Sequence, residues 1–267
     1  MNIHQTAIIS PEAEIDTGVT IGPYCIIEEN AVVSKGVSIG SHSVIGQNTI
    51  IGENCRIFPH VSIGLAPQDL SYSGEKTKAI IGKEVTLREF CTIHRGSSKG
   101  NGQTIIGDGC YFMNYVHVGH DCTVGNEVII ANGTNLGGHV VIHDKANISS
   151  LFLAHQFIEI GELSIISGHT GARKSIPPFV MAEGRPARIM KINTIGLERA
   201  GFSKECIKAI SEAYKLLRKI PTNEANEEIK EMSKEFPQLL KILEFYQNSK
   251  KGVIAFYSAE RGTQIDK

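Results

Sequence analysis

The sequence predicts an all-β N-terminal domain, a parallel β-helix built from hexapeptide repeats, followed by a small α-helical C-terminal domain. Three observations support this fold class. Apolar residues recur with a period of six, this repeat is interrupted only twice, and after residue 185 it gives way to helical periodicity. We therefore expect a β-helix domain over residues 1–185 and a helical domain over residues 186–267.

The repeat places an apolar residue at every sixth position, in 26 positions altogether. It runs from Ile3 to Ile63, recurs at Ile81, Leu87 and Ile93, and runs again from Ile106 to Ala172. Neither an α-helix nor an alternating strand has this period. In a triangular β-helix, three hexapeptides make a coil of about 18 residues, and the repeat residues of stacked coils form a continuous core. Coils stack about 4.8 Å apart, and the glycines that often follow a repeat residue, as Gly22 follows Ile21, suit the corners.

Two stretches leave the repeat and predict loops that project from the prism. The first covers residues 65–79, and the second, residues 95–103, is rich in Gly and Ser. Most loops are plain connectors, but long loops on a rigid repeat scaffold often carry function.

The helical part begins after a Gly-Arg-Pro turn at 184–186. Ser203 is the expected N-cap of a first helix, in which Ile207, Ile210, Ala213, Leu216 and Leu217 form one apolar stripe. A second helix is expected over residues 223–236, and Pro237 opens a third. Residues 250–267 show no pattern and predict a loose tail.

Composition excludes several classes of function. The net charge is −1, so there is no electrostatic case for a nucleic acid or an anionic membrane as partner. Residues 1–185 carry a net −5 and residues 186–267 a net +4, which would let the basic helices steer an acidic partner, although a solvated helical face explains them equally well. Six scattered cysteines predict buried thiols in a reducing compartment, and neither a signal peptide nor a membrane span is recognisable, so we expect a cytoplasmic protein.

The candidate site lies in residues 115–139, which carry more histidine than folding requires. The 18-residue coil makes His120, Gly138 and Gln156 a vertical column and stacks Asp121 on His139. Asp121 then accepts a hydrogen bond from one ring nitrogen of His120 and leaves the other as a base. Gly138 exposes its backbone N–H beside that base, as an oxyanion donor requires. This arrangement favours acyl transfer.

Two other interpretations apply to the histidines. His4, His42 and His60 are expected to be ordinary surface residues. A metal site, as in the gamma-class carbonic anhydrases that share this kind of prism, would require two or three histidines that converge, and His117 and His120 are near enough in sequence to be considered.

Several motifs resemble one family. They are HVGHDCTVGN at 117–126, TIHRG at 92–96, LAPQDLSYSGE at 65–75, AHQF at 154–157, IPPF at 176–179 and GLERAGFS at 196–203. They are similar to the UDP-N-acetylglucosamine O-acyltransferases, which begin lipid A synthesis. The resemblance implies left-handed coiling, a homotrimer with active sites between subunits, no metal or cofactor, and transfer of a 3-hydroxyacyl group from acyl carrier protein to the 3-hydroxyl of the glucosamine.

The resemblance also implies roles for single residues. His120 is the expected general base, Asp121 orients it, and Gly138 supplies the oxyanion N–H. The positions expected to contact nucleotide sugar or acyl donor are Gln68, His94, His117, His139, His155, Gln156, Asn193 and Arg199. Gly168 matches the position that limits acyl length, where a small residue leaves room for a longer chain.

Four positions depart from the family pattern. Ser71 and Ala200 stand where Lys and Arg are common, which removes two potential phosphate or donor contacts. Ser149 and Ser150 stand where glycines are usual, a change without an interpretation. The nearest rival is the related UDP-3-O-acylglucosamine N-acyltransferase, which has an additional N-terminal domain, whereas the repeat here begins at Ile3. A non-catalytic scaffold is a third alternative, against which the His120, Asp121 and Gly138 set argues.

Overall fold

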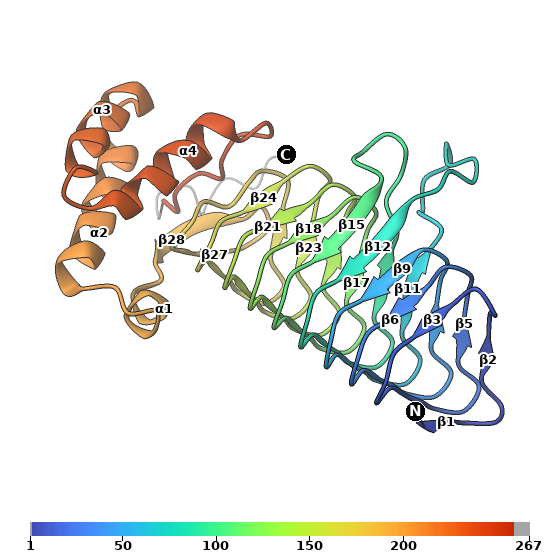
Figure 1. Ribbon diagram of the computed structural model, residues 1–267. Coiled ribbons are helices and arrows are strands. Elements are labelled where there is room, and N and C mark those ends of the chain that lie inside the picture. The colour runs from blue at the N-terminus through green and yellow to red at the C-terminus, as the bar shows by residue number, and fades with distance from the viewer. Residues whose placement is uncertain (1, 259–267) are drawn as a thin grey trace.

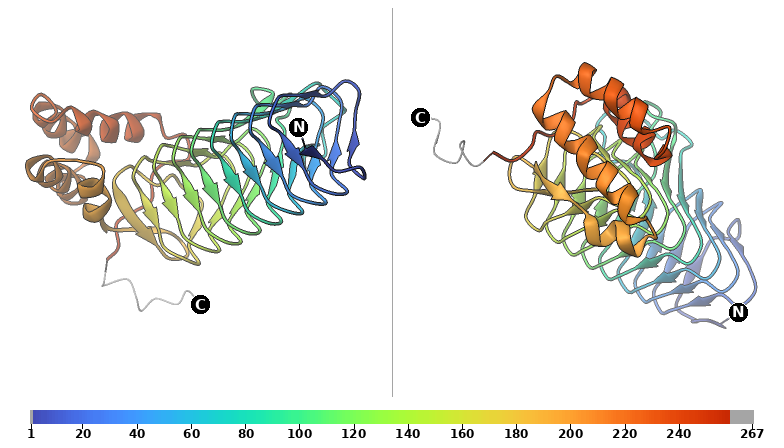
Figure 2. Two further views of the ribbon diagram at one scale, coloured as in Figure 1. Left: turned by 60° about the horizontal axis from the view of Figure 1, so that its bottom comes forward. Right: turned by 90° about the vertical axis from the view of Figure 1, so that its left-hand side faces the viewer.

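The computed structural model describes residues 2–258 and shows a long triangular prism with a group of helices at one end (Figure 1). The chain winds as a left-handed β-helix, as predicted. The helices pack at the end of the prism opposite the N-terminus (Figure 2).

Three sheets form the faces of the prism, and successive strands pass from one face to the next. The sheets are parallel apart from one antiparallel strand at the end of the first. The first sheet contains β1 (Asn2–Ile3), β4 (Thr20–Ile21), β7 (Ser38–Ile39), β10 (Arg56–Ile57), β13 (Thr86–Leu87), β16 (Tyr111–Phe112), β19 (Ile129–Ile130), β22 (Asn147–Ile148), β25 (Ile165–Ile166), β27 (Val180–Glu183) and β28 (Arg188–Ile192). The second sheet contains β2 (Ile8–Ile9), β5 (Ile26–Ile27), β8 (Val44–Ile45), β11 (Ser62–Leu65), β14 (Thr92–His94), β17 (His117–Val118), β20 (Asn135–Leu136), β23 (Leu153–Ala154) and β26 (Gly171–Ala172). The third sheet contains β3 (Glu14–Ile15), β6 (Val32–Val33), β9 (Thr49–Ile51), β12 (Lys78–Ile81), β15 (Gln103–Ile106), β18 (Thr123–Val124), β21 (Val141–Ile142) and β24 (Glu159–Ile160).

The register confirms the predicted coil. Ile130 pairs with Ile148, and Val118 pairs with Leu136, each 18 residues further along the chain. The repeat residues from Ile21 onward are buried in one continuous core, whereas Ile3 in the first coil is 40% exposed. The six cysteines are buried and unpaired, as expected.

The role expected of the glycines was only partly right. Most corners turn through a residue of positive φ three positions after the repeat residue. Asp121 (φ 60°) and His139 (φ 61°) occupy such positions, and glycines such as Gly36 (φ 74°) occupy only some of them. The glycines that follow the repeat residue serve a different purpose. A Cβ on Gly46 would lie 2.4 Å from the carbonyl oxygen of Gly64, so these glycines permit successive corners to stack closely.

The two interruptions are loops that project from the prism, as predicted (Figure 1). The first, residues 66–77, joins β11 to β12 and is called the long loop below. The second, residues 95–102, joins β14 to β15 and is called the short loop. Both leave the second sheet and return to the third, so both lie at the corner between these sheets.

The helical part consists of α1 (Thr194–Arg199), α2 (Lys204–Lys219), α3 (Thr222–Met232), η1 (Pro237–Leu239) and α4 (Leu240–Asn248). Ser203 caps α2 as predicted, because its side chain accepts a hydrogen bond from the N–H of Cys206. The sequence did not predict α1 or the antiparallel β27–β28 pair. The boundary at residue 185 stays a prediction.

The prediction of a loose tail was wrong for residues 250–258, the part of the tail that the structure describes. The N–H of Ile254 donates to the carbonyl of Ser175, and the N–H of Ile189 donates to the carbonyl of Ala255, both at 2.9 Å. Backbone pairing with the last coils therefore orders a segment whose side chains show no periodicity. Residues 259–267 of the predicted tail lie outside the described residues.

Candidate active site

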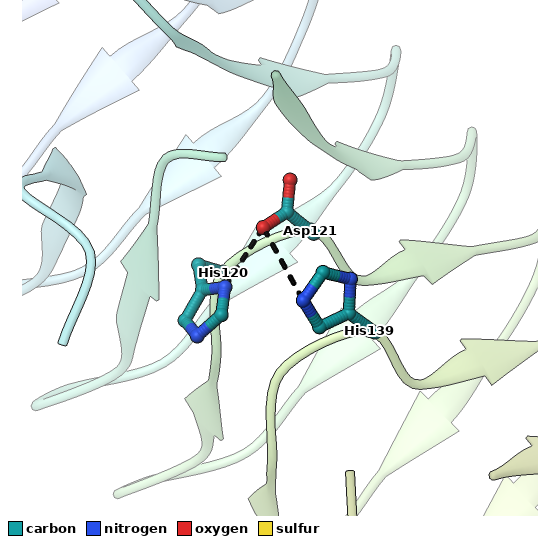
Figure 3. Close-up of side chains that lie close together, drawn as sticks. All are labelled: His120, Asp121 and His139. Carbon is teal, nitrogen blue, oxygen red and sulfur yellow. Dashed lines mark hydrogen bonds and ion pairs between the residues drawn. The ribbon is translucent and has the colours of Figure 1, made fainter. Parts of the chain in front are cut away.

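His120 and Asp121 lie between β17 and β18, at the corner where the second sheet meets the third (Figure 3). The positive φ of Asp121 turns its side chain back toward His120, and His120 Nδ1 lies 2.8 Å from Asp121 Oδ2. An ionised carboxylate only accepts hydrogen bonds, so Nδ1 carries the proton of this bond, and in the neutral ring Nε2 is the nitrogen with the lone pair. Both residues are buried, which protects this hydrogen bond from competition with water.

Gly138 lies one coil further along and faces the imidazole of His120. A Cβ built on Gly138 would lie 2.7 Å from both Cε1 and Nε2 of His120. Only a residue without a side chain fits there. Within residues 2–258, no group accepts a hydrogen bond from the N–H of Gly138. The column predicted from the 18-residue spacing thus places a lone pair beside an unengaged backbone donor.

His139 stacks above Asp121, as the spacing predicted. Its Nε2 lies 3.8 Å from Asp121 Oδ2, its ring meets that of His120 edge-on at 5.1 Å, and it stacks on Phe157 at 4.4 Å. Burial lowers the pKa of His139 below its ordinary value, with the charge of Asp121 acting in the opposite direction. His139 is therefore neutral at pH 7 and offers hydrogen bonds rather than a positive charge.

His94 and His117 are neighbours on the second sheet, with their rings 5.4 Å apart. His94 Nδ1 lies 2.6 Å from the carbonyl oxygen of Ala66 in the long loop, and His117 Nδ1 lies 2.9 Å from Thr92 Oγ1. Burial lowers the pKa of both rings. The two neutral imidazoles can therefore donate or accept hydrogen bonds on the second sheet, next to the corner that carries His120.

The other predicted contact residues are distributed over the molecule. Gln156 continues the column and is exposed, as are His155 beside it and Gln68 in the long loop. Gly168 lies on a different corner, between the first and second sheets, and Arg199 is exposed at the end of α1. A single protomer therefore brings together the predicted catalytic residues but not all the predicted binding residues.

Asn193 has a structural role that the sequence did not indicate. Its Oδ1 accepts a hydrogen bond from the N–H of Gly196 and caps α1, while its Nδ2 donates to the carbonyl of Leu163. Its amide is thus engaged at both ends. Ser71 is engaged as well: its N–H and hydroxyl both donate to Asp69 Oδ1, at 2.9 and 2.8 Å.

Two residues of the site were missed by sequence reasoning. Asp69 lies in the long loop beside Gln68, and the hydrogen bonds from Ser71 lower its pKa, with the charge of His120 contributing. Ser97 lies in the short loop and contacts Asp121 directly. The QD pair was a signal for Asp69. No signal pointed to Ser97, because the short loop has no fixed register with the repeat.

His120, Asp121 and His139 are also the one group of ligand-type side chains that converge among residues 2–258. Their contacts fit a metal poorly. Asp121 Oδ2 already accepts hydrogen bonds from His120 and from Ser97 at 2.8 and 2.6 Å, and His139 Nε2 is 3.8 Å away from it. A zinc ion would need all three ligand atoms at about 2.0–2.2 Å, so this group is better suited to a hydrogen-bonded acid–base pair.

In the same described part of the chain, no helix has the length and apolar character that crossing a bilayer requires.

The prism and the histidine–carboxylate pair at its corner define the chain as a hexapeptide-repeat transferase, and a family model described as "Bacterial transferase hexapeptide (six repeats)" matches residues 103–138. A model described as "GMPPB C-terminal domain" matches residues 1–98.

More specific similarity covers the whole chain. A model described as "Udp N-acetylglucosamine O-acyltransferase; Domain 2" matches residues 176–254. The acyl-[acyl-carrier-protein]–UDP-N-acetylglucosamine O-acyltransferase of Neisseria meningitidis serogroup B is 48% identical over 254 residues, which are 94% of this chain and 98% of that protein. The protein of the same name from Thermodesulfovibrio yellowstonii is 46% identical over 253 residues, with the same coverage. This chain belongs to the family of acyl-[acyl-carrier-protein]–UDP-N-acetylglucosamine O-acyltransferases.

Solved structures agree. The UDP-N-acetylglucosamine acyltransferase of Francisella novicida superposes with a TM-score of 0.94 at 36% identity, over 99% of both chains. That of Bacteroides fragilis superposes with a TM-score of 0.91 at 37% identity, over 94% of this chain and 99% of the other.

Proposed function

We propose that this protein transfers a 3-hydroxyacyl group from acyl carrier protein to the 3-hydroxyl of UDP-N-acetylglucosamine, the first step of lipid A synthesis. The observation that carries the proposal is the position of His120, with Nδ1 on Asp121 and Nε2 facing Gly138. The family membership of the whole chain supplies the substrate class.

In the proposed mechanism, His120 Nε2 removes the proton of the sugar hydroxyl, and the resulting oxygen nucleophile attacks the thioester carbonyl carbon. The oxyanion that forms accepts a hydrogen bond from the N–H of Gly138. The intermediate then collapses, the C–S bond breaks, and the imidazolium returns its proton to the departing thiolate. Asp121 stabilises the imidazolium and keeps the ring in the required tautomer.

The substrate contacts follow from the positions of the other residues. His94, His117 and His139 are neutral donors or acceptors beside the dyad, suited to hydroxyl and amide groups of the sugar. Gln68, Asp69, His155 and Gln156 border the same corner. Asn193 and Arg199 would contact the nucleotide. Because the amide of Asn193 already bonds Gly196 and Leu163, it could use only the remaining N–H and the remaining lone pair of its oxygen.

We further propose a homotrimer, in the cytoplasm, whose active sites lie between protomers. A column of stacked rings runs along the corner between the first and second sheets, with Phe90 43% and Tyr115 60% exposed. Its members, about 5 Å apart, are Tyr24, His42, His60, Phe90 and Tyr115. This exposed edge of aromatic and imidazole rings is suited to burial against a second copy. Docking one protomer's corner near Gly168 beside another's His120 would complete the site.

Gly168 would then set the length of the acyl chain. A Cβ at this position would have one neighbour in its own protomer, the carbonyl oxygen of Ser150 at 3.5 Å, so no residue of that protomer fills the space beyond Gly168. We therefore expect a long 3-hydroxyacyl chain to be accepted.

The experiment is to incubate the purified protein with UDP-N-acetylglucosamine and a series of 3-hydroxyacyl carrier proteins of increasing chain length. The expected product is the 3-O-acyl sugar nucleotide, with the longer donors preferred. A parallel reaction offers the amine of UDP-3-O-acylglucosamine as acceptor. Transfer to that amine with no transfer to the hydroxyl would replace the proposal by N-acylation, and no product with any donor would remove it.

A further inference from the structure

The short loop folds over the corner that carries the catalytic pair and encloses the carboxylate of Asp121. The N–H of Ser97 lies 3.0 Å from Asp121 Oδ1 and 3.1 Å from Oδ2, and the hydroxyl of Ser97 donates to Oδ2 at 2.6 Å. The side chain of Asp121 is 1% exposed as a result. Ser97 itself is buried, so water does not compete for these bonds.

Two other residues close the enclosure. The N–H of Asp121 donates to Thr104 Oγ1 at 2.9 Å, which fixes the backbone of the carboxylate. Gly100 lies flat against the carboxylate, because a Cβ there would be 2.2 Å from Oδ1. Apart from His120, the short loop and the first residues of β15 provide every hydrogen bond that Asp121 makes through its side chain or N–H within residues 2–258.

The short loop is in turn held by the long loop. Ser98 Oγ donates to Glu75 Oε1 at 2.8 Å, and this hydrogen bond lowers the pKa of Glu75. Arg95, which is buried, donates to the carbonyl of Gly64 at 2.9 Å and to Tyr72 Oη at 2.7 Å. The position of Ser97 is therefore defined by contacts on both sides of it.

We infer that Ser97 is a positioning residue for the acyl transfer, which holds Asp121 Oδ2 toward Nδ1 of His120. This inference rests on the proposed role of His120 as the base. With both donors in place, the carboxylate cannot rotate, and the hydrogen bond that selects the tautomer of His120 keeps its direction. Without the hydroxyl, the N–H of Ser97 is the one donor of the short loop left for the two oxygens of Asp121. The carboxylate can then rotate, and Nδ1 of His120 loses an acceptor of fixed position.

Removing the hydroxyl also changes the charge balance. A carboxylate that accepts fewer hydrogen bonds is more basic and attracts the imidazolium more strongly. The proton then leaves His120 only at higher pH. A Ser97→Ala enzyme should therefore lose activity on the acidic side of its pH profile at a higher pH than the wild type.

The test is a double-mutant cycle on purified protein, with turnover measured over a range of pH. Ser97→Ala should lower kcat about tenfold with the KM for UDP-N-acetylglucosamine within about twofold, and should move the acidic limb of the profile upward. In an Asp121→Ala background the same change should cost almost nothing, because Ser97 acts through that carboxylate. Ser98→Ala is the matched comparison, because it removes the bond to Glu75 and loosens the loop without removing a donor to Asp121. It should lower kcat less than Ser97→Ala does and leave the acidic limb of the profile in place.

Three results would overturn the inference: a wild-type kcat and pH profile in Ser97→Ala, equal losses from Ser97→Ala in both backgrounds, or the same loss in Ser98→Ala. Melting temperatures of all variants separate these outcomes from unfolding. If wild-type protein is itself inactive with every donor, the proposed function fails rather than the role of Ser97. If His120→Ala retains the turnover of the wild type, the proposed role of His120 as the base is wrong, and with it the role of Ser97.

Discussion

At the scale of single residues, the site depends on one backbone position that has no side chain. Gly138 places its N–H beside His120 Nε2, and the oxygen that becomes negatively charged must fit between them. Gly168, at the matching position of another corner, also lacks a side chain. The feature that sets Gly138 apart is the histidine one coil before it.

Gly138→Ala tests this geometry. The new methyl group would lie 2.7 Å from Nε2 and Cε1 of an imidazole that Asp121 holds in place. We expect kcat to fall about 100-fold, in the range observed when an oxyanion donor is lost, because the imidazole and the backbone donor must move apart. Gly171→Ala is the control, because its methyl group would meet the flexible side chain of Arg185 at 3.2 Å. Turnover of Gly138→Ala within twofold of wild type would contradict the assigned geometry.

The sequence predicted which residues stack on one another from coil to coil, but not which loop residues contact them from the side. The column of His120 and Gly138 follows from an 18-residue period that the register confirms. Ser97 lies 24 residues before Asp121, and the short loop between them has no repeat to count with. Which backbone donor in a Gly- and Ser-rich loop meets a given carboxylate depends on how the loop packs, and periodicity does not determine packing.

At the scale of elements, the hexapeptides and the longer helices were predictable because each has a period, and α2 also has a side-chain cap in Ser203. The expected stripe on α2 is confirmed in part, since Ile207, Ile210 and Ala213 are buried while Leu216 and Leu217 are only partly so. The six-residue α1 and the β27–β28 pair are too short to show a period. Backbone hydrogen bonds to the final coils, rather than a pattern of side chains, form the strand pair and fix residues 252–257.

The cap of α2 gives a stability prediction at this scale. Ser203 Oγ accepts from the N–H of Cys206 at 3.1 Å, and removing this bond leaves a helix donor without a partner. Ser203→Ala should lower the free energy of unfolding by about 1 kcal/mol, measured by urea denaturation followed through the helical circular dichroism signal. Ser203→Asp keeps an acceptor at the N-terminus and should restore most of the loss. Equal stability of all three proteins would show that the cap contributes nothing.

At the scale of the whole molecule, the prism converts distance along the chain into height along an axis. Residues 18 apart become neighbours, and both loops lie at the same corner. The short loop encloses Asp121, and the long loop, which carries Asp69, is hydrogen-bonded to the short loop through Glu75. The remaining predicted contacts, on another corner and on α1, lie outside this cluster. The proposed assembly of three protomers would account for that separation, because it would set one prism's corner against the next.

The central claim is that His120 is the base of an acyl transfer carried out by an assembled trimer. The most direct measurement is the turnover of His120→Ala with UDP-N-acetylglucosamine and the best 3-hydroxyacyl carrier protein, taken together with the native mass of the variant. We predict a fall in kcat of about 1,000-fold, within the range for a lost general base, in a protein that keeps the mass of three protomers. Turnover near that of the wild type, in a variant of unchanged mass, would contradict the claim.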